Sequence, residues 1–286
     1  MVEGTGIQGH VDGQRGGGDS SVERVESWHR FATVTIESND LDPMYQMAYH
    51  ARALKGEEWV KRYCLHFLLF YHAGDAARAA EEHWSWSRYE YEFDNLQRGT
   101  ERRHYRGAQG RNAMARLRGA TESPATAFES MVAGNYTSLV HLFTKGPFRG
   151  CGFGEYFIWK VLDLQTRVFD HDIELSLDEA CQYLPKEPKE AAVHVFPDLS
   201  RSQALETVLA HIQSIPLGYR AGYCALQEAE TVLCMIKGAF ITKTHQIGDD
   251  IEDKRKALDG WPELQSLLPA PVLGRYECVG NLTPIK

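Results

Sequence analysis

A single, mostly α-helical domain is the fold that this sequence predicts. In several long segments apolar residues recur every three or four positions, which is the spacing of one helix face. Alternating patterns typical of strands are few and short, and no internal repeat divides the chain. The 286 residues are 43% hydrophobic, enough for a substantial core. We therefore expect one helical domain over residues 28–286.

The N-terminal segment differs in composition from the rest. Residues 1–21, MVEGTGIQGHVDGQRGGGDSS, are rich in glycine and nearly free of large apolar groups. Such a segment cannot bury enough surface to offset the entropy lost on ordering. We predict a disordered tail over residues 1–27, with the folded part beginning near Trp28.

Helices are predicted in order along the chain. In GEEWVKRYCLHFLLFYHAGDAARAAEEHW, Trp59, Tyr63 and Phe67 share one helix face, and Asp75 would cap a second, Ala-rich helix to about Trp86. Further helices are expected over residues 155–169 and 221–240, with irregular loops around Arg98 and Pro185. The best strand candidates are VTIES (34–38) and HVFPD (194–198).

Composition and charge exclude several classes of protein. No window approaches the roughly 18 apolar residues of a membrane helix, and no basic and apolar leader begins the chain, so we expect a cytoplasmic protein without membrane contact. The six cysteines contain no C-x-x-C pair, which argues against a zinc ribbon. The net charge of -8 argues against nonspecific coating of nucleic acid, yet permits a local site.

One segment has the opposite charge. Between Arg98 and Arg118 the chain has seven arginines, one glutamate and no lysine or aspartate, beginning with RGTERRHYRG. Arginine grips phosphate oxygens with a planar fork of donors, and Gly99 and Gly107 allow a ligand to approach the backbone closely. On charge alone, a solvated surface that pairs with the chain's own carboxylates explains the segment equally well.

Two helices carry ionisable residues at helical spacing. The turn GCGFG (150–154) opens a helix, an arrangement that can hold a phosphate or simply start the helix, and Lys160, Asp163 and Arg167 then share one face. In the other helix, Glu230 shares a face with Cys234 and Lys237 among mostly apolar residues. Buried ionisable groups need a partner or a task, so a Glu–Lys pair that fixes packing is the alternative to a catalytic role.

An aspartate-rich motif follows, and common catalytic motifs are absent. Asp249, Asp250 and Asp253 form D-D-x-x-D, which can hold Mg²⁺ and pyrophosphate as in the all-α prenyl synthases. The first such element of those enzymes is missing, and an acidic first turn of a surface helix is the commoner explanation. No G-x-S-x-G, H-E-x-x-H or P-loop occurs.

Taken in order, five motifs resemble one family, the bacteriophage amino acid:DNA transferases, also called α-glutamyl/putrescinyl-thymine pyrophosphorylases. The resemblance covers nearly everything after Asp40 and implies a helical fold related to the helix-hairpin-helix DNA glycosylases. It departs from the family at the hairpin, where Gly154-Glu155 replaces a Gly-Pro. The motifs are DPMY (42–45), FLLFYHAGDA (67–76), RGTERRHYRG (98–107), GFGEYFIWKVLDLQTRV (152–168) and QEAETVLCMIKG (227–238).

The resemblance implies a reaction on DNA. In double-stranded phage DNA inside the infected host cell, the amine of a free amino acid would displace pyrophosphate from 5-pyrophosphoryloxymethyl-uracil, a modified thymine. Glycine and serine are the favoured amino acids. No cofactor is implied beyond Mg²⁺ that can accompany the pyrophosphate, and we assign no metal-binding residue. A prenyl-synthase-like enzyme that uses the aspartate motif and a nonenzymatic DNA-binding protein remain alternatives.

The implied reaction assigns roles to residues. Arginines meet the charge of the leaving pyrophosphate, a carboxylate accepts the amine proton, and a flipped base needs a stacking partner. We favour Glu230 over Glu101 as the base, because neighbouring arginines would hold Glu101. The assignments are Arg102, Arg103 and Arg106 for pyrophosphate, His104 for proton donation or a phosphate contact, Glu230, Asp163 or Glu101 for the base, Lys237 or Lys160 for the amino-acid carboxylate, Tyr71, His72 or Trp84 for stacking, and Gly152, Gly154 and Arg111 for the DNA backbone.

Overall fold

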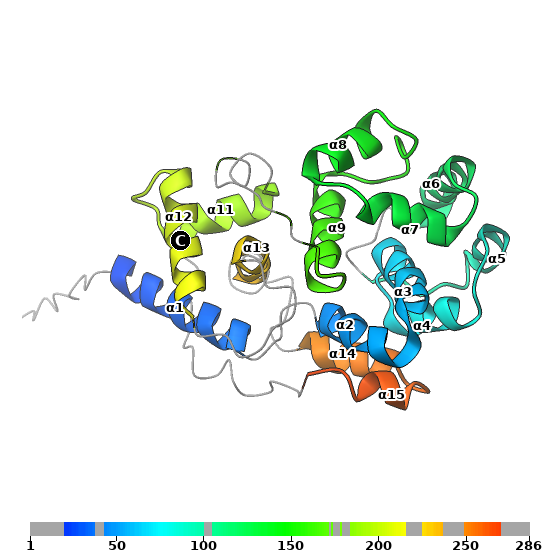
Figure 1. Ribbon diagram of the computed structural model, residues 1–286. Helices are drawn as coiled ribbons and strands as arrows, with labels where there is room; N and C mark the ends of the chain where they lie inside the picture. The colour runs from blue at the N-terminus through cyan, green and yellow to red at the C-terminus, as the bar shows by residue number, and fades with distance from the viewer. Residues whose placement is uncertain are drawn as a thin grey trace, which may run out of the picture.

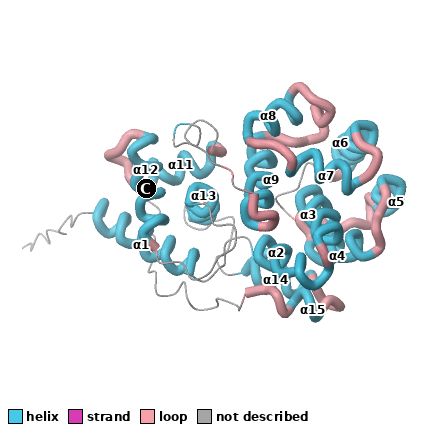
Figure 2. Tube along the Cα trace, in the orientation of Figure 1, coloured by secondary structure: helices cyan, strands magenta, loops and turns pink. Residues whose placement is uncertain are grey.

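The computed structural model is helical throughout the part of the chain that it describes. That part comprises residues 20–37, 43–99, 105–171, 173, 178, 184–215, 225–236 and 249–269. No strand occurs in these ranges (Figure 2), so the predicted mostly α fold is confirmed. The helices are α1 (Ser20–Glu37), α2 (Pro43–Lys55), α3 (Glu57–Phe70), α4 (Ala73–Glu81), α5 (Trp86–Glu92), α6 (Gly107–Ala120), α7 (Pro124–Val132), α8 (Tyr136–Thr144), α9 (Glu155–Arg167), α11 (Lys186–Val195), α12 (Arg201–Ser214), α13 (Ala225–Ile236), α14 (Asp249–Ala257) and α15 (Pro262–Gln265).

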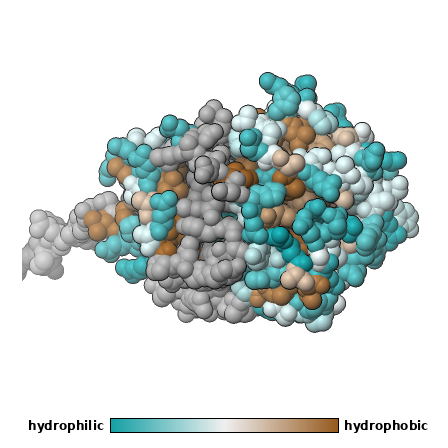
Figure 3. All heavy atoms as spheres, in the orientation of Figure 1, coloured by the Kyte–Doolittle hydropathy of each residue, from teal (hydrophilic) through white to brown (hydrophobic). Residues whose placement is uncertain are grey.

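The helices gather in two groups around one core. In Figure 1, α1, α11, α12 and α13 lie on the left, and α2 to α9 lie on the right together with α14 and α15. Buried apolar side chains from both groups belong to one continuous cluster. On the face in Figure 3, hydrophilic residues cover much of the right-hand edge, as expected of helices that bury one side. Among the described helices, none has the length and apolar character needed to cross a membrane.

Helix α3 is the centre of the right-hand group. It packs against α2, α4, α7 and α9, and most of its side chains are buried. Glu57 and Glu58 lie in its first turn, where negative charge complements the helix dipole. It ends at Tyr71, whose left-handed backbone (φ 56°) lets its N–H donate to the carbonyl of Phe67 at 2.7 Å.

Helix α4 begins differently from the prediction. The capping residue is His72 rather than Asp75, because the His72 Nδ1 accepts the backbone N–H of Asp75 at 3.1 Å. The Asp75 carboxylate instead accepts the backbone N–H of Gln97 at 2.8 Å and so fixes the chain before the arginine segment. The helix ends at Glu81, and Trp86 belongs to the next helix.

Other sequence expectations can be compared with the structure. Helices α9 and α13 confirm the two helices predicted over residues 155–169 and 221–240, within the described residues. Both strand predictions are wrong: residues 34–37 continue α1, and residues 194–195 end α11. Short apolar runs do not distinguish strand from helix.

Helix α1 begins at Ser20, before the predicted boundary near Trp28. Once buried residues anchor a helix, each residue added at its end forms one further hydrogen bond. The predicted disorder of residues 1–19 lies outside the described residues, and the relation to DNA glycosylases stays a prediction.

The fully buried His66 of α3 predicts a loss of stability in acid. Its Nδ1 lies 3.2 Å from the Tyr89 hydroxyl, and burial lowers the pKa of His66 from 6.5 to about 3. Because the folded-state pKa lies below the unfolded value, its contribution to stability is present above pH 6.5 and is lost as the pH falls towards 3. In the wild type, His66 should contribute up to about 1.4 kcal/mol per pH unit to the fall of the unfolding free energy below pH 6.5, and His66→Gln should remove this contribution. Urea denaturation between pH 7.5 and 4 measures the difference.

Exposed His141 provides the matched control for this experiment. His141→Gln should keep the pH dependence of the wild-type protein. A His66→Gln variant whose unfolding free energy follows pH as steeply as the wild type would contradict the assignment.

Candidate active site

The arginine segment begins with an arginine that binds its own backbone. The Arg98 Nε donates to the Tyr105 carbonyl at 2.6 Å, and its two terminal nitrogens donate to the carbonyls of Leu96 and Phe93. The guanidinium lies over the Phe93 ring, with its Cζ 4.7 Å from the ring centroid. Arg98 therefore joins the two ends of residues 98–105 and has a structural role.

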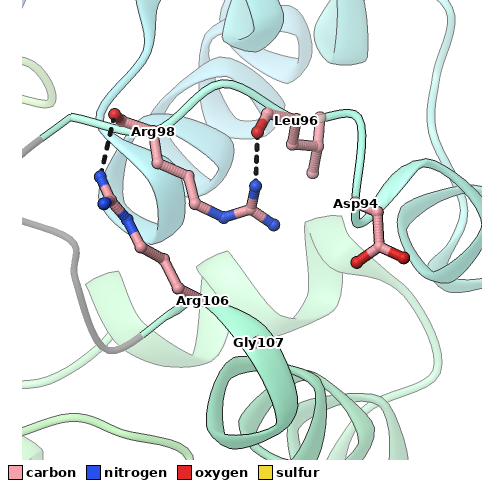
Figure 4. Close-up of a pocket in the computed structure, with 5 residues that line it drawn as sticks. All are labelled: Asp94, Leu96, Arg98, Arg106 and Gly107. Carbon is pink, nitrogen blue, oxygen red and sulfur yellow. Dashed lines mark hydrogen bonds between the residues drawn. The ribbon is translucent and has the colours of Figure 1, made fainter.

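Arg106, a predicted pyrophosphate ligand, lies at the other end of this segment. Its Nη2 donates to the carbonyls of Arg98 and Gly99 at 3.4 and 3.3 Å. Together with Asp94, Leu96, Arg98 and Gly107 it lines a pocket of about 370 Å³, shown in Figure 4. The residues predicted between the two ends, Glu101, Arg102, Arg103 and His104, lie outside the described residues.

Two later arginines have carboxylate partners of their own. Arg111 pairs with Asp94, and Arg118 pairs with Glu90, all on exposed side chains. The solvated-surface explanation therefore fits these two, and the contact of Arg111 with the DNA backbone stays a prediction.

A cluster of five buried ionisable side chains joins α9 to α13. The Lys160 ammonium donates to Asp163 Oδ2 at 3.0 Å and to Glu230 Oε2 at 3.3 Å. Arg167 extends the cluster, with its Nε 3.8 Å from Asp163 Oδ1 and its Nη2 3.6 Å from Glu228 Oε1. None of the five side chains is more than 7% exposed. We call these residues the α9–α13 charge cluster.

The cluster brings together residues that the sequence assigned to separate roles. Glu230 and Asp163 were candidate bases, and Lys160 was a candidate ligand for the amino-acid carboxylate. Among the described residues Glu230 forms an ion pair with Lys160 on another helix, whereas the predicted partner Lys237 lies outside the described residues. Buried ion pairs add little net stability because both charges lose their hydration, so a cluster of this size indicates a role in specificity or chemistry.

The predicted stacking residues are already packed. Trp84 is 4% exposed, its indole N–H donates to Glu82 at 2.9 Å, and the Arg78 guanidinium lies 5.0 Å from its ring. The Tyr71 ring contacts Phe67 and the Lys254 ammonium. Both rings are therefore buried against neighbouring side chains, and their stacking roles stay predictions. The third candidate, His72, uses its ring to cap α4.

Lys254 is a candidate that sequence reasoning missed. Its ammonium lies 4.2 Å from the centroid of the Tyr71 ring, and the residue is 8% exposed. Tyr71 in turn packs against Gly99, where an added Cβ would lie 2.7 Å from the Tyr71 Cδ1. Lys254 therefore adds positive charge near the start of the arginine segment. The sequence did contain a signal for its burial: Lys254 lies three residues after Ile251 and four before Leu258, and this helical spacing places it on the same face as these two fully buried residues.

The aspartate motif and the hairpin look like ordinary helix starts. Helix α14 begins at Asp249, and Asp253 is exposed and pairs with Lys256 at 4.0 Å. The side chains of Asp249 and Asp250 lie outside the described residues, among which no group of His, Cys, Asp or Glu is arranged to hold a metal. In the hairpin, Gly152 has a positive φ of 81°, and Gly154 is the N-cap of α9. The contact of this hairpin with a DNA phosphate stays a prediction.

Comparison with known proteins supports the resemblance seen in the motifs. No protein-family model matches the chain. It is 27% identical to the putrescinyltransferase of Delftia phage PhiW-14, over 91% of this chain and 88% of the relative. It is 26% identical to the glycinyltransferase of Pseudomonas phage PaMx11, over 85% and 94% of the two chains.

A helical body with a buried charge cluster, similar along most of its length to two phage transferases, is a transferase. Its motifs resemble those of the bacteriophage amino acid:DNA transferases, and the similarity to these two relatives supports that family.

Removing the central cation of the cluster should destabilise the fold. In Lys160→Met, Asp163 and Glu230 lose their shared ammonium in a site closed to water, and we expect the free energy of unfolding to fall by about 3–5 kcal/mol. Adding Glu230→Gln should recover part of the loss. Urea denaturation at neutral pH measures both effects.

The control is Lys186→Met, which breaks an exposed pair with Glu190 on α11. It should change the free energy of unfolding by less than about 1 kcal/mol. If the two lysine variants prove equally stable, the cluster does not hold α9 against α13.

Proposed function

We propose that this protein joins the amine of a small molecule to 5-pyrophosphoryloxymethyl-uracil in double-stranded phage DNA and releases pyrophosphate. The observation that carries the proposal is similarity over at least 85% of the chain to a putrescinyltransferase and a glycinyltransferase. Putrescine and glycine share a primary amine, and putrescine has no carboxylate. The common requirement is therefore an amine nucleophile. The reaction would take place in the cytoplasm of the infected host.

The proposed step exchanges one bond for another. The amine nitrogen forms a bond to the exocyclic CH₂ of the base, and the bond from that carbon to the pyrophosphate oxygen breaks. Pyrophosphate leaves with the electron pair, and the nitrogen loses a proton to a base. The protein must therefore stabilise an anion at one end of the reaction and accept a proton at the other. A thymine derivative inside a duplex is proposed to flip out of the stack to reach such a site.

The arginine segment is the proposed site for pyrophosphate. Arg98 and Arg106 fix the two ends of the segment and line the pocket in Figure 4. Arg102 and Arg103 lie between these ends in the sequence, and a segment held at both ends loses less entropy when its arginines bind. We assign Arg102, Arg103 and Arg106 to the pyrophosphate, with His104 as proton donor or further contact. Lys254 adds a cation near the same end.

The α9–α13 charge cluster is the proposed site that handles the amine. Glu230 is the proposed base, positioned by Lys160, which also holds Asp163. Because Lys160 already donates to two carboxylates, Lys237 is the better candidate for an amino-acid carboxylate. Glycine and serine are the proposed amino acids.

A transfer assay tests the proposed function directly. DNA that contains the pyrophosphorylated base is incubated separately with glycine, serine and putrescine, and its nucleosides are analysed by mass spectrometry. We expect one amine to give a new nucleoside together with released pyrophosphate. If no amine gives one, the transferase proposal fails. Loss of pyrophosphate release in EDTA and in Asp250→Ala would favour the metal-dependent alternative, and DNA binding without any adduct would favour the nonenzymatic one.

Replacing the proposed base should slow transfer without loss of DNA binding. In Glu230→Gln the amide cannot accept the amine proton, so we expect the transfer rate at saturating amine to fall by roughly 10²- to 10⁴-fold. Single-turnover kinetics measure the rate, and thermal unfolding checks that the variant is folded.

Glu228→Gln is the matched control, since Glu228 lies on the same helix and pairs with Arg167. It should slow transfer much less. Equal losses in the two variants would make Glu230 a structural member of the cluster, and an unchanged rate in Glu230→Gln would exclude it as the base.

A further inference from the structure

Two segments of this acidic protein contain no acidic residues. Helix α6 contains three arginines and no Asp or Glu, and residues 130–154 also lack acidic residues while containing Lys145 and Arg149. Both of these basic residues are exposed. Because the whole chain has a net charge of -8, local positive charge of this kind indicates a surface that attracts a polyanion.

Among the α6 arginines, Arg116 differs from its neighbours. Arg111 and Arg118 are paired with carboxylates, whereas the described residues provide no ion pair for Arg116. Its guanidinium lies against the hairpin instead: a Cβ added at Gly150 would lie 2.5 Å from the Arg116 Nη1. Gly150 has a φ of 78°, so both its backbone conformation and this close approach favour glycine.

Arg116 lies in a polar groove between α6 and the hairpin. The groove has a volume of about 430 Å³, and no carboxylate lines it. Gln109, Asn112 and Arg116 are spaced by three and four residues, so they lie on one exposed face of α6. Amide and guanidinium donors of this kind, beside glycine backbone, are typical contacts of DNA phosphates. The lining residues are Gln109, Asn112, Ala113, Arg116, Gly150 and Gly152.

Tyr105 connects the hairpin beside the groove to the arginine segment. The Tyr105 hydroxyl donates to the carbonyl of Cys151 in the hairpin at 2.5 Å, and the Tyr105 carbonyl accepts from Arg98 at 2.6 Å. Tyr105 is fully buried and therefore fixes the hairpin relative to the proposed pyrophosphate site. Burial raises the pKa of Cys151 to about 11 although Arg116 opposes the shift, so this thiol is neutral and is not a nucleophile.

We infer that the α6–hairpin groove binds the sugar-phosphate backbone of duplex DNA, with Arg116 as its main contact. The inference rests on the proposed function, because it assigns the path of the DNA that carries the modified base. From Gln109 to Arg116 the helix rises about 10 Å, which equals about three nucleotide steps of one strand. The groove therefore fits a short run of backbone, and Tyr105 links the hairpin that lines it to the segment of Arg98 and Arg106.

The test measures affinity for unmodified duplex DNA at several salt concentrations by fluorescence anisotropy. Loss of one phosphate contact in Arg116→Gln should weaken binding several-fold and reduce the slope of log K against log salt by about 1. Arg116→Lys keeps the charge and should keep most of the slope. Arg118→Gln, on the same helix, removes an arginine already paired with Glu90 and should bind like the wild type.

Two results would overturn the inference. One is equal affinity in Arg116→Gln and Arg118→Gln, and the other is a normal salt slope in Arg116→Gln with folding confirmed by circular dichroism. Unmodified DNA and the absence of amine separate this test from the transfer reaction. A protein that makes no adduct can still show the Arg116 effect, and an active transferase can lack it.

Discussion

The ion pair between Lys160 and Glu230 is the constraint on which the arrangement of the helices depends. Helix α9 packs with α2, α3, α7 and α8, whereas α13 packs with α1, α11 and α12, so this pair connects the two groups through their polar side chains. A cation at this depth has lost its hydration and is tolerated only when carboxylate oxygens lie within hydrogen-bonding distance. Apolar packing alone tolerates small sliding of one helix along another. A buried ammonium held by two carboxylates does not tolerate such sliding, because its hydrogen bonds would break. The ion pair therefore fixes the register between α9 and α13.

The arginine segment shows that one residue type serves several physical roles. Arg98 donates to three backbone carbonyls and holds the ends of the segment together, while Arg111 and Arg118 form exposed pairs worth little energy. Arg106 lines a pocket, and Arg116 lies along a groove lined by donors. An excess of positive charge in the sequence therefore indicates an anion site without identifying the residues that form it. An arginine whose guanidinium group already has acceptors within the protein is less available to bind an anion. Many of those acceptors lie on other segments, so the sequence of the arginine segment does not reveal them.

Much of the fold, and less of the site, could be predicted from the sequence. Periodicity located α3, α9 and α13, and it placed Lys160, Asp163 and Arg167 on one face, because these patterns are local. It did not show that this face meets α13, since spacing along a helix contains no information about its partner. The burial of Tyr71 and Trp84 could not be predicted for a related reason, because an aromatic side chain gives no local sign of its neighbours. The capping role of His72 was missed because a histidine ring is an uncommon N-cap, whereas Asp75 fits the usual pattern.

The separation of charges between the two candidate sites agrees with the chemistry proposed for the protein. An amine arrives as a cation and must become neutral before it attacks, whereas pyrophosphate is an anion throughout. In the described residues the carboxylates Asp163, Glu228 and Glu230 lie between α9 and α13 together with Lys160 and Arg167. The pocket and the groove lined by arginines lie at the segment after α5 and along α6. The α9–α13 charge cluster contains three carboxylates and two cations, a formal net charge of -1, which suits a site that receives a cationic amine. A leaving group that gains negative charge is stabilised by arginines held in place before the reaction. The fold therefore provides each end of the reaction with the sign of charge that it requires.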